Sequence, residues 1–370
     1  MPLPLPRRLH YTTISDRQAY AMGFDFQSLG EFDLEKDIAR IESILRELDV
    51  EPVRLSYGAT FMSELERERP LLLWNLNSGV LGFSREAQVP AICEMLAIPL
   101  VGPRAWTGLV TQDKSLACCW VASECRESVA IAPHVLIREQ SDIHLLRNLA
   151  HGVRYIIKPN HDESSRGITA DSVQSDLAAL GIKVLDTLVH WGPVRVERFI
   201  AGVNISANAA TDEEGRIVAL EPIFVEVEDL VDSGLTKLNH QRTITPVANK
   251  DPGLANRIKR LVMELVRIFR FRHYARFDLR LEEDTGILYF LEANICPSFE
   301  PEDDFAIAAR HSGITFKDLI RNSVAAAWRD ACCEEHLSEV PAMVHPFIAH
   351  AIEDRSPREQ QAQEEQTAPK

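Results

Sequence analysis

The sequence predicts an α/β protein, with an open, largely parallel sheet at the N-terminus and a following region that mixes helices with antiparallel strands. Stretches with helical periodicity alternate with short apolar runs that end in turn residues, a pattern typical of strands joined by helices. Towards the C-terminus, two strand patterns are separated only by a short turn, which indicates a hairpin. The length of 370 residues corresponds to about two or three domains, and 45% hydrophobic residues are enough for their cores.

The first predicted element is a helix over residues 33–48, for which Asp33 is available as the N-cap. Its apolar side chains recur with the spacing of one helix face, at Leu34, Ile38, Ile41, Leu45 and Leu48. A short apolar run at 70–74 predicts a buried strand that enters a loop, and a helix at 88–96 and a strand at 98–101 follow it. This succession predicts parallel pairing, and we expect residues 1–107 to form the first domain.

The middle and C-terminal parts of the chain carry equally clear patterns. They predict a helix at 113–122, strands at 154–159 and 194–200, and a long amphipathic helix at 254–269. Strands at 274–281 and 287–293 flank an Asp-Thr-Gly turn and should pair as an antiparallel hairpin. We expect a central subdomain over 108–195, a C-terminal subdomain over 196–345 and a disordered tail over 346–370, which lacks large apolar side chains from Glu353 onwards.

Charge and composition exclude several classes of function. Forty basic residues against fifty-five acidic ones give a net charge of −15, which argues against nucleic-acid binding and against attraction to anionic membranes. No apolar run approaches the roughly 20 residues of a membrane span, and prolines interrupt the N-terminus where a signal peptide would be apolar. Seven cysteines without a CxxC spacing indicate neither a disulfide framework nor a zinc ribbon, so we expect a reduced, cytoplasmic setting.

The predicted hairpin carries the most informative group of polar side chains. Because side chains alternate along a strand, Arg276, Asp278 and Arg280 should share one face. Antiparallel pairing can place Asp278 beside Glu292 and Asn294 on the partner strand. Two carboxylates and an amide oxygen suit Mg²⁺, and Arg276 could meet a phosphate or an oxyanion. An amphipathic hairpin whose polar face merely contacts water is an equally weighted interpretation of this pattern alone.

A second candidate site follows the predicted strand that ends at Lys158. The segment from Lys158 to Gly167 holds a lysine, two serines, an arginine and a glycine, which are the groups that make a phosphate cradle. Its spacing is not that of a Walker A loop, and a surface loop is the simpler interpretation of this segment taken alone. Lys114, at the start of a predicted helix, would likewise be an ordinary solvated lysine.

Six short motifs nevertheless occur in a definite order. They are Trp74-Asn-Leu-Asn-Ser-Gly79, Ile98-Pro-Leu-Val-Gly102, Asp113-Lys114, Ile157-Lys-Pro with Ser164-Ser-Arg-Gly167, Glu197-Arg-Phe-Ile-Ala-Gly202, and Ala275-Arg-Phe-Asp278 with Leu291-Glu-Ala-Asn294. Together they resemble the D-alanine–D-alanine ligase family of ATP-grasp ligases, from about residue 32 to 327. The resemblance implies the α+β ATP-grasp fold, in which two subdomains sandwich a nucleotide behind an N-terminal α/β domain.

The resemblance also implies a role for each matching residue. For the phosphates of ATP, it implies contacts from Lys114 and Lys158 and a loop over the γ-phosphate that contains Ser164 and Ser165. For the adenine, it implies contacts from Glu197 and from the backbone near Phe199 and Ile200. For the ribose, it implies a contact from Asn204. For the metal, it implies one or two Mg²⁺ ions, or Mn²⁺ in their place, bound by Asp278, Glu292 and Asn294. For catalysis, it implies that Arg276 contacts the oxyanion, that Ser165 is a further catalytic residue and that Lys237 is a lid lysine.

The implied reaction is that of an ADP-forming ligase. A small carboxylate would be activated as an acyl phosphate and joined to a small amine, in a protein that is a homodimer by the same resemblance. An alternative is a pseudoenzyme that keeps the nucleotide site for regulation or assembly. The two would differ in whether Asp278→Asn or Glu292→Gln abolishes ATP turnover.

Several positions depart from the family pattern. Asn204 stands where the family has a ribose-binding glutamate, Glu163 where the phosphate loop has glycine, and the segment 83–88 where the family has Glu-Asp-Gly. Glu302, Asp303 and Asp304 form an acidic run, and Asp303 falls where a family serine binds the second substrate's carboxylate. Because acids repel a carboxylate, a cationic or neutral amine is one hypothesis for the acceptor. An equally weighted alternative is that the loop is shifted and its acids are solvated.

Overall fold

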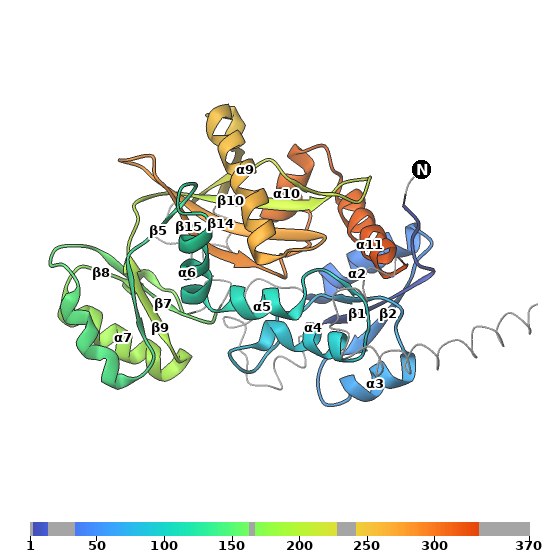
Figure 1. Ribbon diagram of the computed structural model, residues 1–370, viewed down its shortest axis with the longest axis horizontal. Helices are drawn as coiled ribbons and strands as arrows, with labels where there is room; N and C mark the ends of the chain where they lie inside the picture. The colour runs from blue at the N-terminus through green and yellow to red at the C-terminus, as the bar shows by residue number, and fades with distance from the viewer. Residues whose placement is uncertain (1–2, 14–33, 163–166, 228–241, 333–370) are drawn as a thin grey trace, which may run out of the picture.

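The computed structural model describes residues 3–13, 34–162, 167–227 and 242–332, arranged around three sheets (Figure 1). The α/β class predicted from the sequence is confirmed. The expected tail over 346–370 and the expected N-cap Asp33 lie outside the described residues. No helix in the described part of the chain is long and apolar enough to cross a membrane. The domain boundaries predicted at 107 and 195 stay predictions.

The N-terminal sheet is parallel throughout, as predicted. Its strands lie in the order β2 (Glu51–Ser56), β1 (Arg8–Thr13), β3 (Leu73–Asn75), β4 (Leu100–Val101). The helices of this region are α2 (Leu34–Glu47), α3 (Phe61–Glu68) and α4 (Arg85–Met95). Helix α2 matches the predicted helix, whereas α4 begins three residues before the predicted start at Gln88. Sequence reasoning did not find β1, β2 or α3.

The largest sheet of the described chain has seven strands. The path along it is β13 (Arg242–Pro246), β12 (Ile223–Val227), β10 (Gly202–Thr211), β14 (Tyr274–Glu282), β15 (Leu288–Asn294) and β5 (Ala130–Ile131), with β11 (Ile217–Ala219) paired to β10. The predicted hairpin is β14–β15, and it is antiparallel as expected. Only the pairing of β15 with β5 is parallel among the described strands of this sheet.

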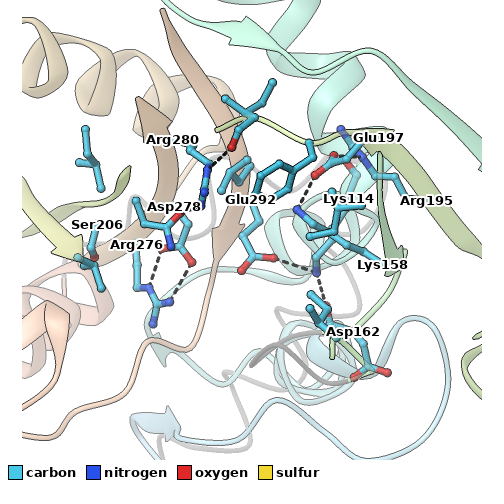
Figure 2. A pocket seen from close by; sticks show the side chains of 18 of the residues that line it. Lys114, Lys158, Asp162, Arg195, Glu197, Ser206, Arg276, Asp278, Arg280 and Glu292 are labelled. Atoms are coloured by element: carbon cyan, nitrogen blue, oxygen red, sulfur yellow. Dashed lines mark hydrogen bonds and ion pairs between the residues drawn. The ribbon is translucent and has the colours of Figure 1, made fainter. Parts of the chain in front are cut away.

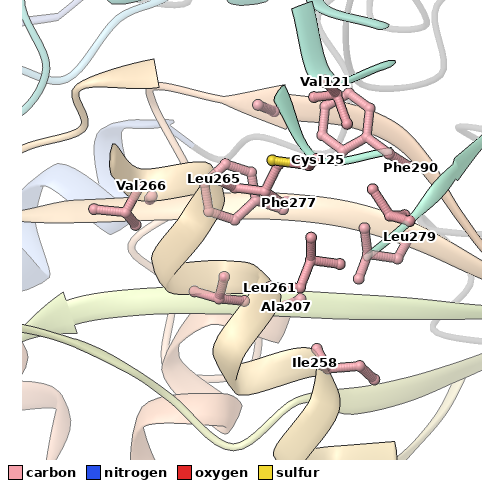
Figure 3. Close-up of a cluster of buried hydrophobic side chains, with 14 of the residues drawn as sticks. Val121, Cys125, Ala207, Ile258, Leu261, Leu265, Val266, Phe277, Leu279 and Phe290 are labelled. Carbon is pink, nitrogen blue, oxygen red and sulfur yellow. The ribbon is translucent and has the colours of Figure 1, made fainter. Parts of the chain in front are cut away.

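One face of this sheet carries the main hydrophobic core. Helix α9 (Pro252–Phe269) lies across it and buries Ile258, Leu261 and Leu265 against Phe277 and Leu279 (Figure 3). Helix α6 (Lys114–Glu124) adds Val121 to the same cluster. Because strand side chains alternate, burial of Phe277 and Leu279 on this face directs Arg276, Asp278 and Arg280 to the other. The hydrophobic packing of α9 thus determines which face of β14 is polar.

The third sheet has the order β6 (His134–Ile137), β9 (Val194–Arg198), β7 (Tyr155–Pro159), β8 (Val173–Gln174) and is antiparallel. Helix α7 (Leu177–Trp191) packs on it through Leu180 and Val184. The predicted strand at 154–159 is β7, and the one at 194–200 ends earlier, at Arg198. Helix α5 (Ala105–Gln112) precedes α6, whose N-cap Asp113 accepts a hydrogen bond from the Leu116 N–H at 2.9 Å.

The N-terminal sheet is joined to the seven-stranded sheet by a shared core of aromatic side chains. Tyr274 and Phe299 form a central pair with T-shaped ring geometry. Trp74 makes a T-shaped contact with Phe299, and Phe305 makes a T-shaped contact with Phe299 and a tilted one with Tyr274. The Trp74 indole N–H also donates to the Tyr274 hydroxyl at 3.1 Å. Helices α10 (Asp304–His311) and α11 (Phe316–Cys332) complete this core. The start of α10 is thereby fixed beside the polar face of β14.

Candidate active site

A pocket lies between the third sheet and the polar face of the seven-stranded sheet. Its polar lining comes from several elements: Lys114 at the start of α6, Lys158 on β7, Arg195 and Glu197 on β9, Asn204 and Ser206 on β10, Arg276, Asp278 and Arg280 on β14, Glu292 on β15, Arg242 on β13 and Asp304 on α10. In Figure 2, Lys114, Lys158 and Glu197 lie on one side of the pocket and Arg276 and Asp278 on the other, with Glu292 between them. The structure therefore brings together most of the described residues that the sequence singled out.

The hairpin supplies the carboxylate end of the pocket. Asp278 pairs in register with Glu292, and Arg276 with Asn294, before a bulge shifts the register after Asp278. The Arg276 guanidinium donates to both Asp278 oxygens at 2.9 Å, and the Asn294 amide lies 3.4 Å from Asp278 Oδ2. Lys114 Nζ lies 3.0 Å from a Glu292 oxygen (Figure 2). Each carboxylate is thus held by its own cation.

These ion pairs also set the protonation of the site. Burial alone would raise the pKa of Glu292, but attraction by Lys114 and then by Arg276 lowers that pKa to about 2. Asp278 in turn raises the pKa of Arg276 well above its usual value, against the effect of burial. Glu292 is therefore deprotonated and Arg276 charged near neutral pH.

The donor set fits a hard divalent cation. Asp278 and Glu292 present carboxylate oxygens, which Mg²⁺ and Mn²⁺ accept, whereas Asn294 turns its amide nitrogen to Asp278 Oδ2 and would have to turn its oxygen there to serve as a third ligand. Among the described residues, no group of three or more His, Cys, Asp and Glu side chains could hold a metal ion. A cation here would depend on the paired carboxylates and the amide.

The other end of the pocket is built around the buried carboxylate of Glu197. It accepts from Lys158 Nζ at 2.5 Å and from Arg195 Nε at 2.7 Å, and Arg195 also donates to the backbone oxygen of Lys114 at 2.8 Å. Burial opposes ionisation of Glu197, but Lys158 and Arg195 lower its pKa to about 2. Arg195 was not identified from the sequence, because its place in an alternating strand resembles an exposed position.

The chain that follows β9 lines the pocket at Phe199 and Ile200. Arg280 Nε donates to the backbone oxygen of Ile200, and Arg280 Nη1 donates to Asn204 Oδ1, both at 2.6 Å. The guanidinium groups of Arg154 and Arg280 lie 4.9 and 5.3 Å from the ring centre of Phe199. Because an arginine can only donate, Asn204 must turn its oxygen to Arg280, which leaves its NH₂ group for other contacts.

The phosphate-loop serines Ser164 and Ser165, together with Glu163 and the expected lid residue Lys237, lie outside the described residues. The start of the loop is described and is held from two sides. Lys114 Nζ donates to the backbone oxygen of Asp162, and Arg85 Nη1 donates to that of His161 at 2.7 Å. Phe83 stacks on the His161 ring at 4.7 Å. The segment 83–88 therefore contacts His161, at the start of the predicted phosphate loop.

The three acids of the 302–304 run have different environments. Glu302 is a surface residue 3.4 Å from Arg40, as expected from the alternative in which the acid is solvated. Asp303 caps α10, with its Oδ1 accepting from the Asp304 N–H at 2.8 Å. Asp304 is buried, lines the pocket and accepts from Arg242 Nη2 at 2.8 Å. Helix capping, which the sequence pattern did not resolve, turns one acid inward.

The environment of Glu300, just before this run, predicts that the stability of the folded chain depends on pH. Burial, a hydrogen bond with Asp37 and the charge of Asp303 raise its pKa from 4.5 to about 8. The folded chain then holds this proton more tightly than the unfolded chain, so stability falls as pH rises from about 4.5 to about 8. We expect Glu300→Gln to unfold at the same temperature as the parent chain near pH 4.5 and at a higher one at pH 8. Thermal unfolding across this range checks the prediction, and equal midpoints at pH 8 would contradict it.

Comparisons of the sequence and of the structure with known proteins find D-alanine–D-alanine ligases and related ligases. A family model described as D-ala D-ala ligase C-terminus matches residues 129–325. The D-alanine–D-alanine ligase of Nitrosospira multiformis is 26% identical over 64% of this chain and 74% of its own length. That of Fervidobacterium nodosum is 24% identical over 81% of this chain and 98% of its own.

Solved structures show the same fold. The ATP complex of D-alanine–D-alanine ligase from Bacillus anthracis superposes with a TM-score of 0.66 at 16% identity, covering 88% of this chain and 99% of that one. The VanG D-Ala:D-Ser ligase of Enterococcus faecalis gives a TM-score of 0.64 at 14% identity, covering 86% of this chain and 99% of that one.

Proposed function

Because the chain belongs to the D-alanine–D-alanine ligase family, and is thus an ATP-dependent ligase that forms C–N bonds, we propose that it activates a small carboxylate with ATP and joins it to a small amine. The observation that carries the proposal is the pairing of Asp278 with Glu292 beside Arg276, Lys114 and Lys158 in one pocket. This arrangement combines anionic metal ligands with cations for phosphate. A pseudoenzyme would not need both.

The proposed chemistry proceeds in two steps. A carboxylate acylates poorly because its leaving group would be oxide, so its oxygen first takes the γ-phosphoryl group of ATP and ADP leaves. The amine then attacks the acyl phosphate, phosphate leaves, and a proton is lost from nitrogen. Phosphoryl transfer depends on positioning and charge neutralisation rather than on a side-chain nucleophile. Lys114 and Lys158 fit the phosphates, and an Mg²⁺ on Asp278, Glu292 and Asn294 would neutralise further negative charge.

Arg276 is proposed to bind the oxyanion that forms during amine attack. Its guanidinium is partly buried, carries its charge at any relevant pH and is oriented by the two contacts with Asp278. A fixed donor of this kind acts without reorganisation when the charge develops. The base and ribose of ATP are proposed to lie at the opposite end, near Glu197, Phe199, Ile200 and Asn204. Ser164, Ser165 and Lys237 complete the proposal as groups over the phosphates.

Two further parts of the proposal rest on the family resemblance and on the use of ATP. The protein is proposed to act in the cytoplasm, where ATP is available, and to form a homodimer. Sedimentation of the purified chain measures the second point, for which a monomer at micromolar concentration would be the contrary result.

The direct test is a panel of carboxylates and amines incubated with MgATP. We expect one pair to give ADP and phosphate in equal amounts, together with an amide product identified by its mass. AMP and pyrophosphate as products would contradict acyl-phosphate chemistry. Nucleotide binding without turnover across the panel would instead favour the pseudoenzyme.

A further inference from the structure

At the pocket end next to Arg276, the charged side chains are arranged in a way that is unsuited to a carboxylate group on the amine substrate. Three groups there could hold an anion: Arg276, Arg242 and the N-terminus of α10. Arg276 uses two of its donors on Asp278, and the proposed function assigns its remaining donors to the oxyanion of the reaction. Arg242 lies 2.8 Å from Asp304 and 3.7 Å from Asp303. The first N–H group of α10 is taken by the Asp303 carboxylate.

Asp304 offers the opposite kind of binding group. The residue is only 2% exposed, yet it lines the pocket. Its Oδ2 accepts from Arg242, while its Oδ1 is buried and has no hydrogen-bond partner among the described residues. A buried carboxylate oxygen without a partner is unfavourable, and a positively charged donor in the pocket would satisfy it. Because Asp303 and Asp304 share Arg242, this end keeps a surplus of negative charge.

We propose that the amine substrate of this ligase carries a second, positively charged nitrogen and no carboxylate beside its reacting nitrogen, as in a primary diamine. The charged nitrogen binds Asp304 Oδ1, and the neutral amine at the other end of the substrate faces the acyl phosphate. The inference rests on the proposed function, since it assigns the acceptor of that reaction. It also gives a reason for the aspartate at position 303, where a substrate carboxylate would meet a negative charge.

Equilibrium binding tests the inference without requiring turnover. The full chain, saturated with Mg²⁺ and a non-hydrolysable ATP analogue, is titrated calorimetrically with 1,4-diaminobutane, butylamine and D-alanine. We expect the diamine to bind about 10-fold or more tightly than butylamine, which lacks the second charge, because a charge-assisted hydrogen bond to a buried group is strong. D-Alanine should bind more weakly than either amine. Equal or tighter binding of D-alanine would overturn the inference.

Variants locate the effect. Asp304→Asn keeps the shape of the side chain but removes its charge, and should weaken diamine binding about 10-fold or more. Glu302→Gln, two residues away and exposed, serves as the matched control and should leave diamine binding unchanged. If Asp304→Asn fails to fold, Asp303→Asn reports on the same charge surplus, because asparagine also caps a helix. Unchanged diamine affinity in the variant that folds would overturn the inference.

The outcomes separate the inference from the proposed function. Diamine binding that depends on Asp304, in a chain that turns over no substrate pair, would support the diamine site at Asp304 but contradict the ligase proposal and, with it, the role of the diamine as substrate. Ligase activity with D-alanine as the best acceptor would confirm the proposed function and overturn the inference.

Discussion

Asp278→Asn and Glu292→Gln are each expected to lower ATP turnover by about 100-fold or more, the size of effect seen when one preorganised group is removed from a charged reaction centre. Each change removes half of the carboxylate pair that is proposed to face the phosphates and releases the cation paired with it. Arg276 would lose its bidentate partner in the first variant, and Lys114 its counter-ion in the second. ADP release with the best substrate pair from the panel is the measurement.

A control on the same hairpin makes this result specific. Glu283 lies exposed at the turn between β14 and β15, so Glu283→Gln changes the net charge equally without entering the pocket. It should retain the parent rate. Full turnover in Asp278→Asn or in Glu292→Gln would show that the pair is structural and would weaken the whole account of the site.

Glu197→Gln is expected to destabilise the fold by about 3–5 kcal/mol, because removing one member of a buried ion pair leaves the other charges uncompensated. Lys158 and Arg195 both donate to this carboxylate, and Arg195 is only 1% exposed. The free energy of unfolding at pH 7, from urea titration, is the measurement. Arg195→Met combined with Glu197→Gln should recover part of the loss, since one stranded cation is gone.

The pH dependence of the same variant provides an independent check. The folded-state pKa of Glu197 is lowered from 4.5 to about 2, so its stabilisation is present above pH 4.5 and is lost as pH falls towards 2. Glu197→Gln should therefore approach the parent chain in stability at low pH. A constant difference between the two chains from pH 7 to pH 3 would contradict this assignment of the carboxylate.

Local patterns predicted much of the site. The period of two along a strand places Arg276 and Asp278 on one face, and a nearby turn brings Glu292 opposite. These relations involve fewer than about 20 residues of chain, so they could be obtained without the structure. Helix α9 could equally be predicted from the sequence, since its apolar stripe is long and regular.

Contacts between side chains that are far apart in the chain could not be predicted from the sequence in this way. Arg280 meets Asn204 only because β10 pairs with β14 in that register, across 76 residues of chain. Arg242 reaches Asp304 from a strand on the far side of β12. Arg85 appeared in the sequence only as part of a departure from a motif, although it is buried and donates to the backbone oxygen of His161. In each case the partner of the arginine is set by tertiary structure.

The acidic run shows the same limit at short range. In the sequence, Glu302, Asp303 and Asp304 are three similar residues, and the repulsion of a carboxylate could be assigned to any of them. The start of α10 distinguishes them, because the cap position fixes Asp303 and the first helical residue turns inward. One acid is exposed, one caps the helix and one is available to a ligand.

In the proposed reaction a carboxylate passes through an acyl phosphate in this pocket. Isotope transfer detects that intermediate: the best carboxylate of the panel is labelled with ¹⁸O in both carboxyl oxygens and incubated with MgATP and its amine. Mass spectrometry of the released inorganic phosphate should find one ¹⁸O atom for each amide formed, because the bridging oxygen leaves with phosphate. Phosphate without ¹⁸O, with both labelled oxygens elsewhere, would contradict the account.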